Sequence, residues 1–123
     1  MTATVLFIFA GLMGAAGIGL AAAGAHAAPG TGLDSAGDML LFHAAGVAAI
    51  AVGVEMGLLW RPLGLVAAFG LVLGAALFSG DLTLRAFSDA RLFPRAAPTG
   101  GIVMIVSWLL VTGAAIARLL RAG

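Results

Sequence analysis

The chain has no cysteine, no tyrosine and no lysine, and it is poor in charge of either sign. Without cysteine it can form no disulfide and offers no thiolate as a nucleophile or as a ligand for a metal or cluster. Charged residues make up 9% of the sequence, against about 25% in soluble domains. The formal net charge of +1 is too small to indicate a nucleic-acid-binding protein, so no nucleic-acid partner is expected.

Hydrophobic residues make up 63% of the 123 residues, and the mean hydropathy is +1.19. So few polar side chains cannot cover a surface that faces water, and lipid is therefore the expected solvent. A helix that spans a bilayer needs about 20 predominantly apolar residues. Four segments meet this requirement, at about residues 4–27, 38–59, 62–80 and 98–120. The sequence predicts one all-α domain over residues 1–123, an integral membrane four-helix transmembrane bundle with both termini on the same side.

The first apolar segment ends in Ala25-His26-Ala27, which imitates the small-x-small cleavage site of a signal peptide. No arginine or lysine precedes the apolar run, and that run is much longer than the hydrophobic region of a signal peptide. We therefore interpret the segment as a retained first helix.

The connections between the segments carry turn and capping signals. Residues 29–32, Pro-Gly-Thr-Gly, should end the first helix, and Asp34 or Ser35 should cap the second. Trp60-Arg61-Pro62 predicts a tight hairpin. Glu55 is expected to pair at the interface with Arg61, Arg118 or Arg121, and a role in a proton relay is the alternative. Residues 81–97 mix arginines with apolar side chains, which fits either a short interfacial helix or a solvated loop.

Small residues recur at four-residue spacing along three of the helices. They are Gly11, Ala15, Gly19 and Ala23 in the first helix, Ala45, Ala49, Gly53 and Gly57 in the second, and Gly70 and Gly74 in the third. Such stripes let helix backbones approach closely in lipid, where there is no hydrophobic drive for association. They fit packing within one bundle, and they also fit an interface with a second copy or a partner.

Four crossings bring several distant polar residues and glycines to one end of the bundle. They are His26, His43, Ser79, Gly80, Asp81, Thr99, Gly100 and Gly101. Polar groups in lipid need partners, so His26, His43 and Asp81 are candidates for one another. This layer fits hydrogen bonds that hold the bundle together, and it also fits a ligand or proton site. A metal or haem site would lack a third firm ligand, so no metal and no cofactor is expected.

His43 is predicted about five residues inside its helix, or roughly 7 Å deep. Trp108 is predicted near the middle of the membrane, where its indole should pack against the glycine-rich faces and needs one acceptor. Gly100 and Gly101 open the fourth helix, so their amides suit either an anion or close helix packing. The Gly-Lys-Ser/Thr element of a phosphate loop is missing.

A set of short motifs, taken together, resembles the YgdD-type small inner-membrane proteins, the family known as domain of unknown function 423. The motifs are Gly24-Ala25-His26, Phe42-His43, Leu77-Phe78-Ser79-Gly80, and Pro98-Thr99-Gly100-Gly101 followed by Trp108. Two positions depart from the family pattern. Asp81-Leu82-Thr83 stands where the family usually has Ser-Leu-Tyr, and Ser107 stands where a glycine commonly precedes the tryptophan. The resemblance implies four transmembrane helices in a bacterial inner membrane, and it implies no established activity.

These features predict a non-catalytic membrane protein, either an accessory or assembly subunit or a self-associating bundle. Small size, short loops and small-residue helix faces favour this hypothesis, and no catalytic constellation is visible, so the protein is not expected to be an enzyme. The alternative is a small-molecule, ion or proton binding or transport element built on the layer around His26, His43 and Asp81. Expected partners are membrane lipid and either a homo-oligomer or a larger membrane complex. Arginines are equally numerous at the two ends, so the orientation stays undetermined.

Overall fold

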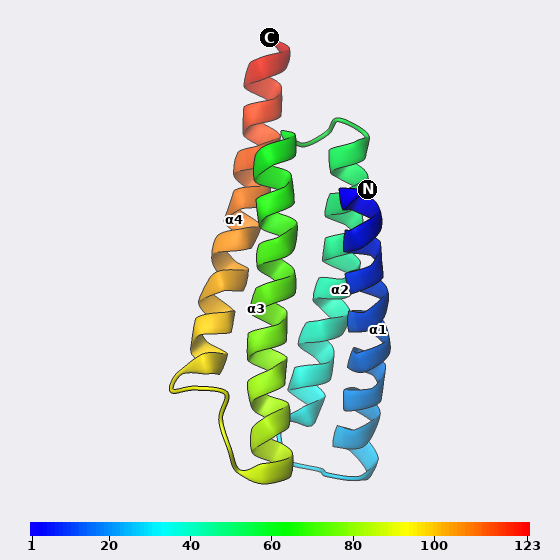
Figure 1. Ribbon diagram of the computed structural model, residues 1–123, viewed down its shortest axis with the longest axis vertical. Helices are drawn as coiled ribbons and strands as arrows, with labels where there is room; N and C mark the ends of the chain where they lie inside the picture. Colours follow the sequence, from blue (N-terminus) through cyan, green and yellow to red (C-terminus); the bar gives the residue numbers. More distant parts are fainter.

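A computed structural model describes residues 1–123 and consists of four α-helices joined by three connections (Figure 1). The helices are α1 (Thr2–His26), α2 (Leu33–Glu55), α3 (Arg61–Ser88) and α4 (Ala96–Ala122). Each is long and apolar enough to cross a membrane. The predicted all-α fold with four transmembrane helices is therefore confirmed.

The start of α2 differs from the prediction. The helix begins at Leu33, five residues earlier than expected, because Leu33 is fully buried and the end of α1 packs against this turn. A Cβ atom at Gly24 would lie 2.5 Å from the backbone nitrogen of Asp34. The predicted side-chain cap by Asp34 or Ser35 is wrong, since Gly32 is the N-cap residue and has the positive φ of 87° that glycine tolerates.

The end of α3 also differs from the prediction. The helix continues to Ser88, so residues 81–88 are its last two turns and no separate interfacial helix is present. An ion pair between Asp81 and Arg85, four residues apart on the same face, supports this extension. The connection to α4 is consequently short, covering residues 89–95.

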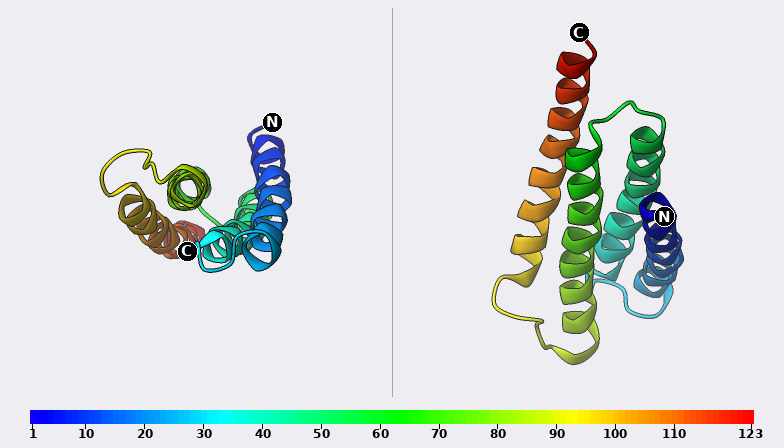
Figure 2. Two further views of the ribbon diagram at one scale, coloured as in Figure 1. Left: turned by 90° about the horizontal axis from the view of Figure 1, so that it is seen from below. Right: turned by 45° about the horizontal axis from the view of Figure 1, so that its top comes forward.

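The four helices form an open row in chain order, and α3 is set to one side of α2 and α4 when the molecule is seen from below (Figure 2, left). Helix α1 packs on α2, α2 on α3 and α3 on α4, while α1 touches α3 only slightly. The inner helices are the buried ones: in their most apolar windows, 50% of α2 residues and 39% of α3 residues are buried, against 22% in α1 and 17% in α4. Both outer helices therefore present most of their surface to the surroundings.

Glycines let neighbouring helices in the row come into backbone contact. A Cβ atom at Gly37 of α2 would lie 2.6 Å from the nitrogen of Ala21 in α1. A Cβ atom at Gly100 of α4 would lie 2.6 Å from the carbonyl oxygen of Gly74 in α3. Gly11 and Gly19 of α1, by contrast, have nothing within 4 Å of a Cβ position. The predicted stripes are thus used differently: that of α3 packs within the chain, and that of α1 faces outward.

The connections divide between the two ends of the row. The α1–α2 and α3–α4 connections lie at the lower end in Figure 1, and the α2–α3 connection lies toward the upper end, to which both termini also point. At the upper end Arg61 pairs with Glu55 at 2.7 Å, and the Arg121 guanidinium lies 4.2 Å from the ring centroid of Trp60. The lower end carries the polar residues singled out from the sequence.

Candidate functional site

The structure separates the predicted polar layer into buried and exposed members. His43, Ser79, Asp81 and Gly100 are buried, Gly80 and Gly101 are half-buried, and His26 and Thr99 are exposed. His43 lies ten residues from the start of α2, or roughly 15 Å along the helix axis, which is about twice the predicted depth. The early start of α2 at Leu33 accounts for this difference.

His43 uses both of its ring nitrogens within the protein. Its Nδ1 atom lies 2.7 Å from the carbonyl oxygen of Met39, one helical turn earlier. The indole Nε1–H of Trp108 in α4 donates to His43 Nε2 at 3.2 Å. A carbonyl can only accept and an indole N–H can only donate, so this arrangement defines the neutral imidazole with its proton on Nδ1. His43 is therefore the acceptor for Trp108.

Trp108 reaches from α4 to α2. Its ring rests on Gly46, where a Cβ atom would lie 2.9 Å from the indole Cη2 atom. The bond to His43 is the one hydrogen bond that joins α2 to α4, two helices that make few other contacts with each other. Trp108 remains 42% exposed, so its outer edge faces the surroundings of the protein.

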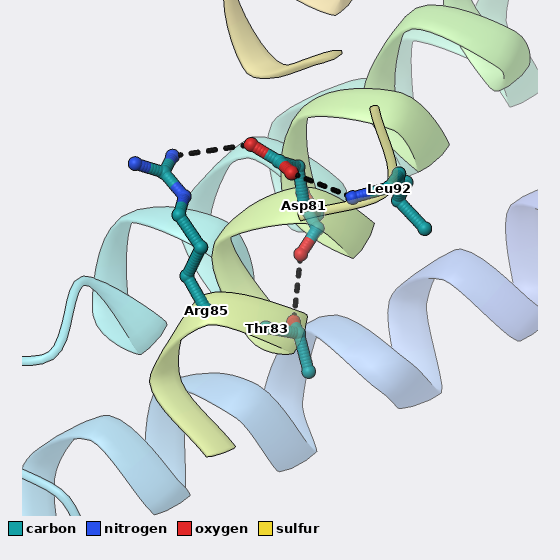
Figure 3. Close-up of polar contacts among 5 residues, drawn as sticks. Asp81, Thr83, Arg85 and Leu92 are labelled. Atoms are coloured by element: carbon teal, nitrogen blue, oxygen red, sulfur yellow. Dashed lines mark hydrogen bonds and ion pairs between the residues drawn. The ribbon is translucent and has the colours of Figure 1, made fainter. Parts of the chain in front are cut away.

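Asp81 holds the α3–α4 connection against the end of α3 (Figure 3). Its side chain is 1% exposed, and its Oδ1 atom accepts a hydrogen bond of 3.1 Å from the backbone N–H of Leu92. Its Oδ2 atom lies 3.3 Å from Nη2 of Arg85. Gly80 leaves room for Leu92, whose Cδ1 atom would lie 3.5 Å from a Cβ atom there. The buried carboxylate thus fixes the connection that leads into α4.

The structure does not bring His26, His43 and Asp81 together, and the expectation that they are partners is wrong. Ser79 Oγ donates to the carbonyl oxygen of Ala36 at 2.8 Å, which sets the level of α3 relative to α2. At that register His43 and Asp81 are separated by about eight residues of helix, or roughly 12 Å. The physical reason is that each finds a closer partner: Trp108 for His43 and Arg85 for Asp81.

Some of these partners had a signal in the sequence and others had none. The Asp81–Arg85 pair has i,i+4 spacing, which commonly places opposite charges together on a helix. The backbone groups of Met39 and Leu92 carry no side-chain signal. The need of Trp108 for one acceptor was predicted, but its identity depended on how three helices pack.

Gly100 belongs to the α3–α4 crossing. A Cβ atom at Gly100 would lie not only close to Gly74 but also 2.7 Å from the backbone nitrogen of Phe78. The next amide toward the N-terminus, that of Thr99, donates to the carbonyl oxygen of Arg95 at 2.9 Å. Of the two interpretations of this glycine pair, close helix packing is the one that the geometry favours for Gly100.

An apolar cleft of about 510 Å³ lies between α1 and α3, with Leu40 of α2 on its wall. Its lining comprises Leu12, Met13, Ala16, Leu20, Leu40, Ala76, Ser79, Gly80, Thr83, Leu84, Phe87 and Leu92. The two hydroxyls on this lining donate to the chain itself, Ser79 to Ala36 and Thr83 to the carbonyl oxygen of Ser79 at 2.6 Å (Figure 3). The cleft therefore presents mainly hydrocarbon.

The polar side chains act mainly on the chain's own backbone. The hydroxyl of Ser107 donates to the carbonyl oxygen of Val103 at 2.7 Å, as Thr83 does to Ser79. No three histidine, aspartate or glutamate side chains converge as a metal site would require. The fold and these contacts define a small multi-pass α-helical membrane protein whose buried polar groups join neighbouring helices and connections.

Comparisons with known proteins identify the family. Residues 20–101 match the model of a family described as protein of unknown function (DUF423). The inner membrane protein YgdD of Escherichia coli strain K12 is 31% identical over 131 aligned residues, which cover 100% of this chain and 97% of that protein. The YgdD protein of Shigella flexneri matches to the same extent. This chain belongs to the DUF423 family, which confirms the resemblance seen in the sequence, and it is a multi-pass inner-membrane protein. No solved structure matches it.

Proposed function

We propose that this protein is a non-catalytic membrane protein that acts by associating with a second copy of itself through the outward face of α1. The observation that supports this proposal is the stripe of Gly11, Ala15 and Gly19. All three are exposed, and no atom lies within 4 Å of a Cβ position at either glycine. At the corresponding glycines of α3, Gly70 and Gly74, the space for a Cβ atom is filled by Ser107 and Met104 of α4.

The shape of the row adds a second argument. Helix α1 is an outer helix that buries few of its residues, and the apolar cleft begins directly beside the stripe, at Leu12 and Ala16. In lipid, helices associate through close packing of small residues, since lipid tails are as apolar as leucine. A second copy docked by two-fold symmetry would place stripe against stripe, and each copy would offer the same surface.

A non-catalytic role agrees with the polar contacts. The hydroxyls of Ser79, Thr83 and Ser107 donate to backbone carbonyls. Both ring nitrogens of His43 are hydrogen-bonded, one to the Met39 carbonyl and one to the Trp108 indole. A hydrolytic or transfer site needs a nucleophile within hydrogen-bond reach of a base, and these groups are paired otherwise. The transport alternative built on His26, His43 and Asp81 draws no support from the geometry, because the three residues do not share a site.

The test is the oligomeric state in lipid vesicles. Because the chain has no cysteine, one introduced cysteine carries a donor or acceptor dye, and energy transfer is measured as protein is diluted with lipid. Wild type should dimerise, and the double variant Gly11→Leu, Gly19→Leu should weaken the dimer at least about tenfold, which equals about 1.4 kcal/mol. Gly101→Leu is the matched control, since this glycine lies on the other outer helix with open space at its Cβ position.

Three outcomes would contradict the proposal. One is a monomer at every dilution. Another is equal weakening by the control and the stripe variant. The third is a fixed, different polypeptide that co-purifies at unit stoichiometry and loses contact when Gly11 and Gly19 are replaced, which would make the protein an accessory subunit.

A further inference from the structure

We infer that His43 and Trp108 form a proton-sensitive latch between α2 and α4, closed while His43 is neutral and opened when Nε2 takes up a proton. The latch is the 3.2 Å hydrogen bond from Trp108 Nε1–H to His43 Nε2. It is the one hydrogen bond between the two helices. The inference is independent of self-association, because it concerns contacts inside one chain.

The response of the latch to protonation follows from which ring nitrogens of His43 and Trp108 can donate and which can accept a hydrogen bond. The Nδ1–H of His43 donates to the carbonyl of Met39 at 2.7 Å, so Nε2 offers the lone pair that Trp108 needs. A proton taken from water and added to Nε2 turns that acceptor into a donor, with one N–H bond formed. Two N–H groups then face each other, and the indole N–H cannot reverse its role because it only donates. The hydrogen bond is lost on protonation.

No carboxylate lies beside His43 to offset the new positive charge. Along α2 the nearest charged residues are Asp38 and Glu55, five and twelve positions away. The spans of α1, α3 and α4 carry no charged residue at the level of His43. The charged or titratable residues of those three helices lie near helix ends: His26 in α1, Arg61, Asp81 and Arg85 in α3, and Arg118 and Arg121 in α4. Asp81 is already paired with Arg85 and lies roughly 12 Å away along the helix axis.

The latch controls how firmly α4 is held against the rest of the row. Without it, α4 keeps its crossing with α3 at Gly74 and Gly100 and the bond from Arg118 Nε to the carbonyl of Gly57 at 2.6 Å. Trp108 would leave its seat on Gly46, and the face between α2 and α4 would widen. Because Trp108 is 42% exposed, the ring can move outward without disturbing the buried core.

The first measurement is the fluorescence of Trp108 in vesicles. The chain has two tryptophans, so Trp60→Phe leaves Trp108 as the one emitter. As the vesicles are acidified, protonation of His43 Nε2 should release the indole and change the emission in one single-proton transition. His43→Gln should abolish this transition, because a glutamine can accept from Trp108 but does not titrate. His26→Gln is the matched control and should leave it intact, since His26 is exposed at the end of α1.

The second measurement follows the movement itself. Spin labels at Ala45→Cys on α2 and Ile105→Cys on α4, both exposed positions, report the separation of the two helices. The distance should lengthen in acid in the wild-type background and stay constant in His43→Gln. A flat fluorescence titration, a transition that survives His43→Gln, or a titration with no change in distance would each overturn the latch.

Discussion

Replacement of Gly37 by alanine should separate α1 from α2 and lower the stability of the protein. A Cβ atom at this position would lie 2.6 Å from Ala21 N, 2.7 Å from Gly17 O and 3.0 Å from Ala21 Cα. All three are backbone atoms, which cannot move aside as the end of a side chain could. Ordinary van der Waals contact begins at 3.4 Å, so the two helices must part by about 0.8 Å at the crossing.

The size of the effect follows from two opposing contributions. A gap of about 0.5–1 Å removes a quarter to a half of the dispersion energy of each contact across it, and overpacking typically costs about 1–3 kcal/mol. Alanine gains at most about 1 kcal/mol over glycine in a helix interior. We therefore expect a net loss of about 1–2 kcal/mol. Gly14→Ala, with open space at its Cβ position and outside the stripe of Gly11 and Gly19, should be neutral or stabilising.

The assay is unfolding of the purified protein in mixed micelles as the fraction of a denaturing detergent rises, followed by circular dichroism. The midpoint for Gly37→Ala should fall below that of wild type, while the midpoint for Gly14→Ala should not. Equal midpoints for wild type and Gly37→Ala would refute the backbone contact between α1 and α2. Equal losses in both variants would show that the effect comes from glycine itself and not from the crossing.

Three further predictions concern single polar contacts, and the same unfolding assay measures them. Ser79→Ala should cost about 0.5–1.5 kcal/mol because it removes the bond to Ala36 that sets the register of α3 on α2, and no loss would argue against that bond. Asp81→Leu should cost about 1–3 kcal/mol by leaving the Leu92 N–H without its acceptor, whereas Asp81→Asn, which can still accept, should cost less. Equal losses would show that the hydrogen bond to Leu92 is not the source of the stability. Glu55→Gln should leave the midpoint unchanged, since both side chains of the Glu55–Arg61 pair are about half exposed, and a clear loss would contradict this.

The sequence was sufficient to predict the helices because their signal is local. Runs of about 20 apolar residues, broken by Pro29-Gly30 and by the Trp60-Arg61-Pro62 hairpin, mark four spans without knowledge of their packing. An ion pair of Glu55 at the interface was also predictable, but the sequence left Arg61, Arg118 and Arg121 open as partners; the structure pairs Glu55 with Arg61, and these two residues flank the 56–60 connection. The extension of α3 to Ser88 was missed because polar residues after Gly80 resemble a loop until the Asp81–Arg85 pair is counted as helical.

The site was less predictable because it depends on which helices are neighbours. Topology alone places His43 and Asp81 toward the same end, and it does not reveal that Trp108 of α4 lies within reach of His43 in α2. The contacts of the small-residue stripes of α1 and α3 were equally hard to predict from the sequence. Gly11 and Gly74 have the same local pattern, yet Gly74 is in contact with Gly100 while Gly11 faces outward, a difference that only the order of the helices decides.

Four membrane crossings place the 27–32 and 89–95 connections on one face of the membrane and residues 56–60 on the other. Single cysteines at Thr31, Pro94 and Gly57, introduced into a chain that has none, report this directly when sealed inner-membrane vesicles are treated with a thiol reagent that cannot cross lipid. We predict that Thr31→Cys and Pro94→Cys react from the same side and Gly57→Cys from the opposite side. Labelling of Thr31→Cys and Pro94→Cys from different sides would contradict the account.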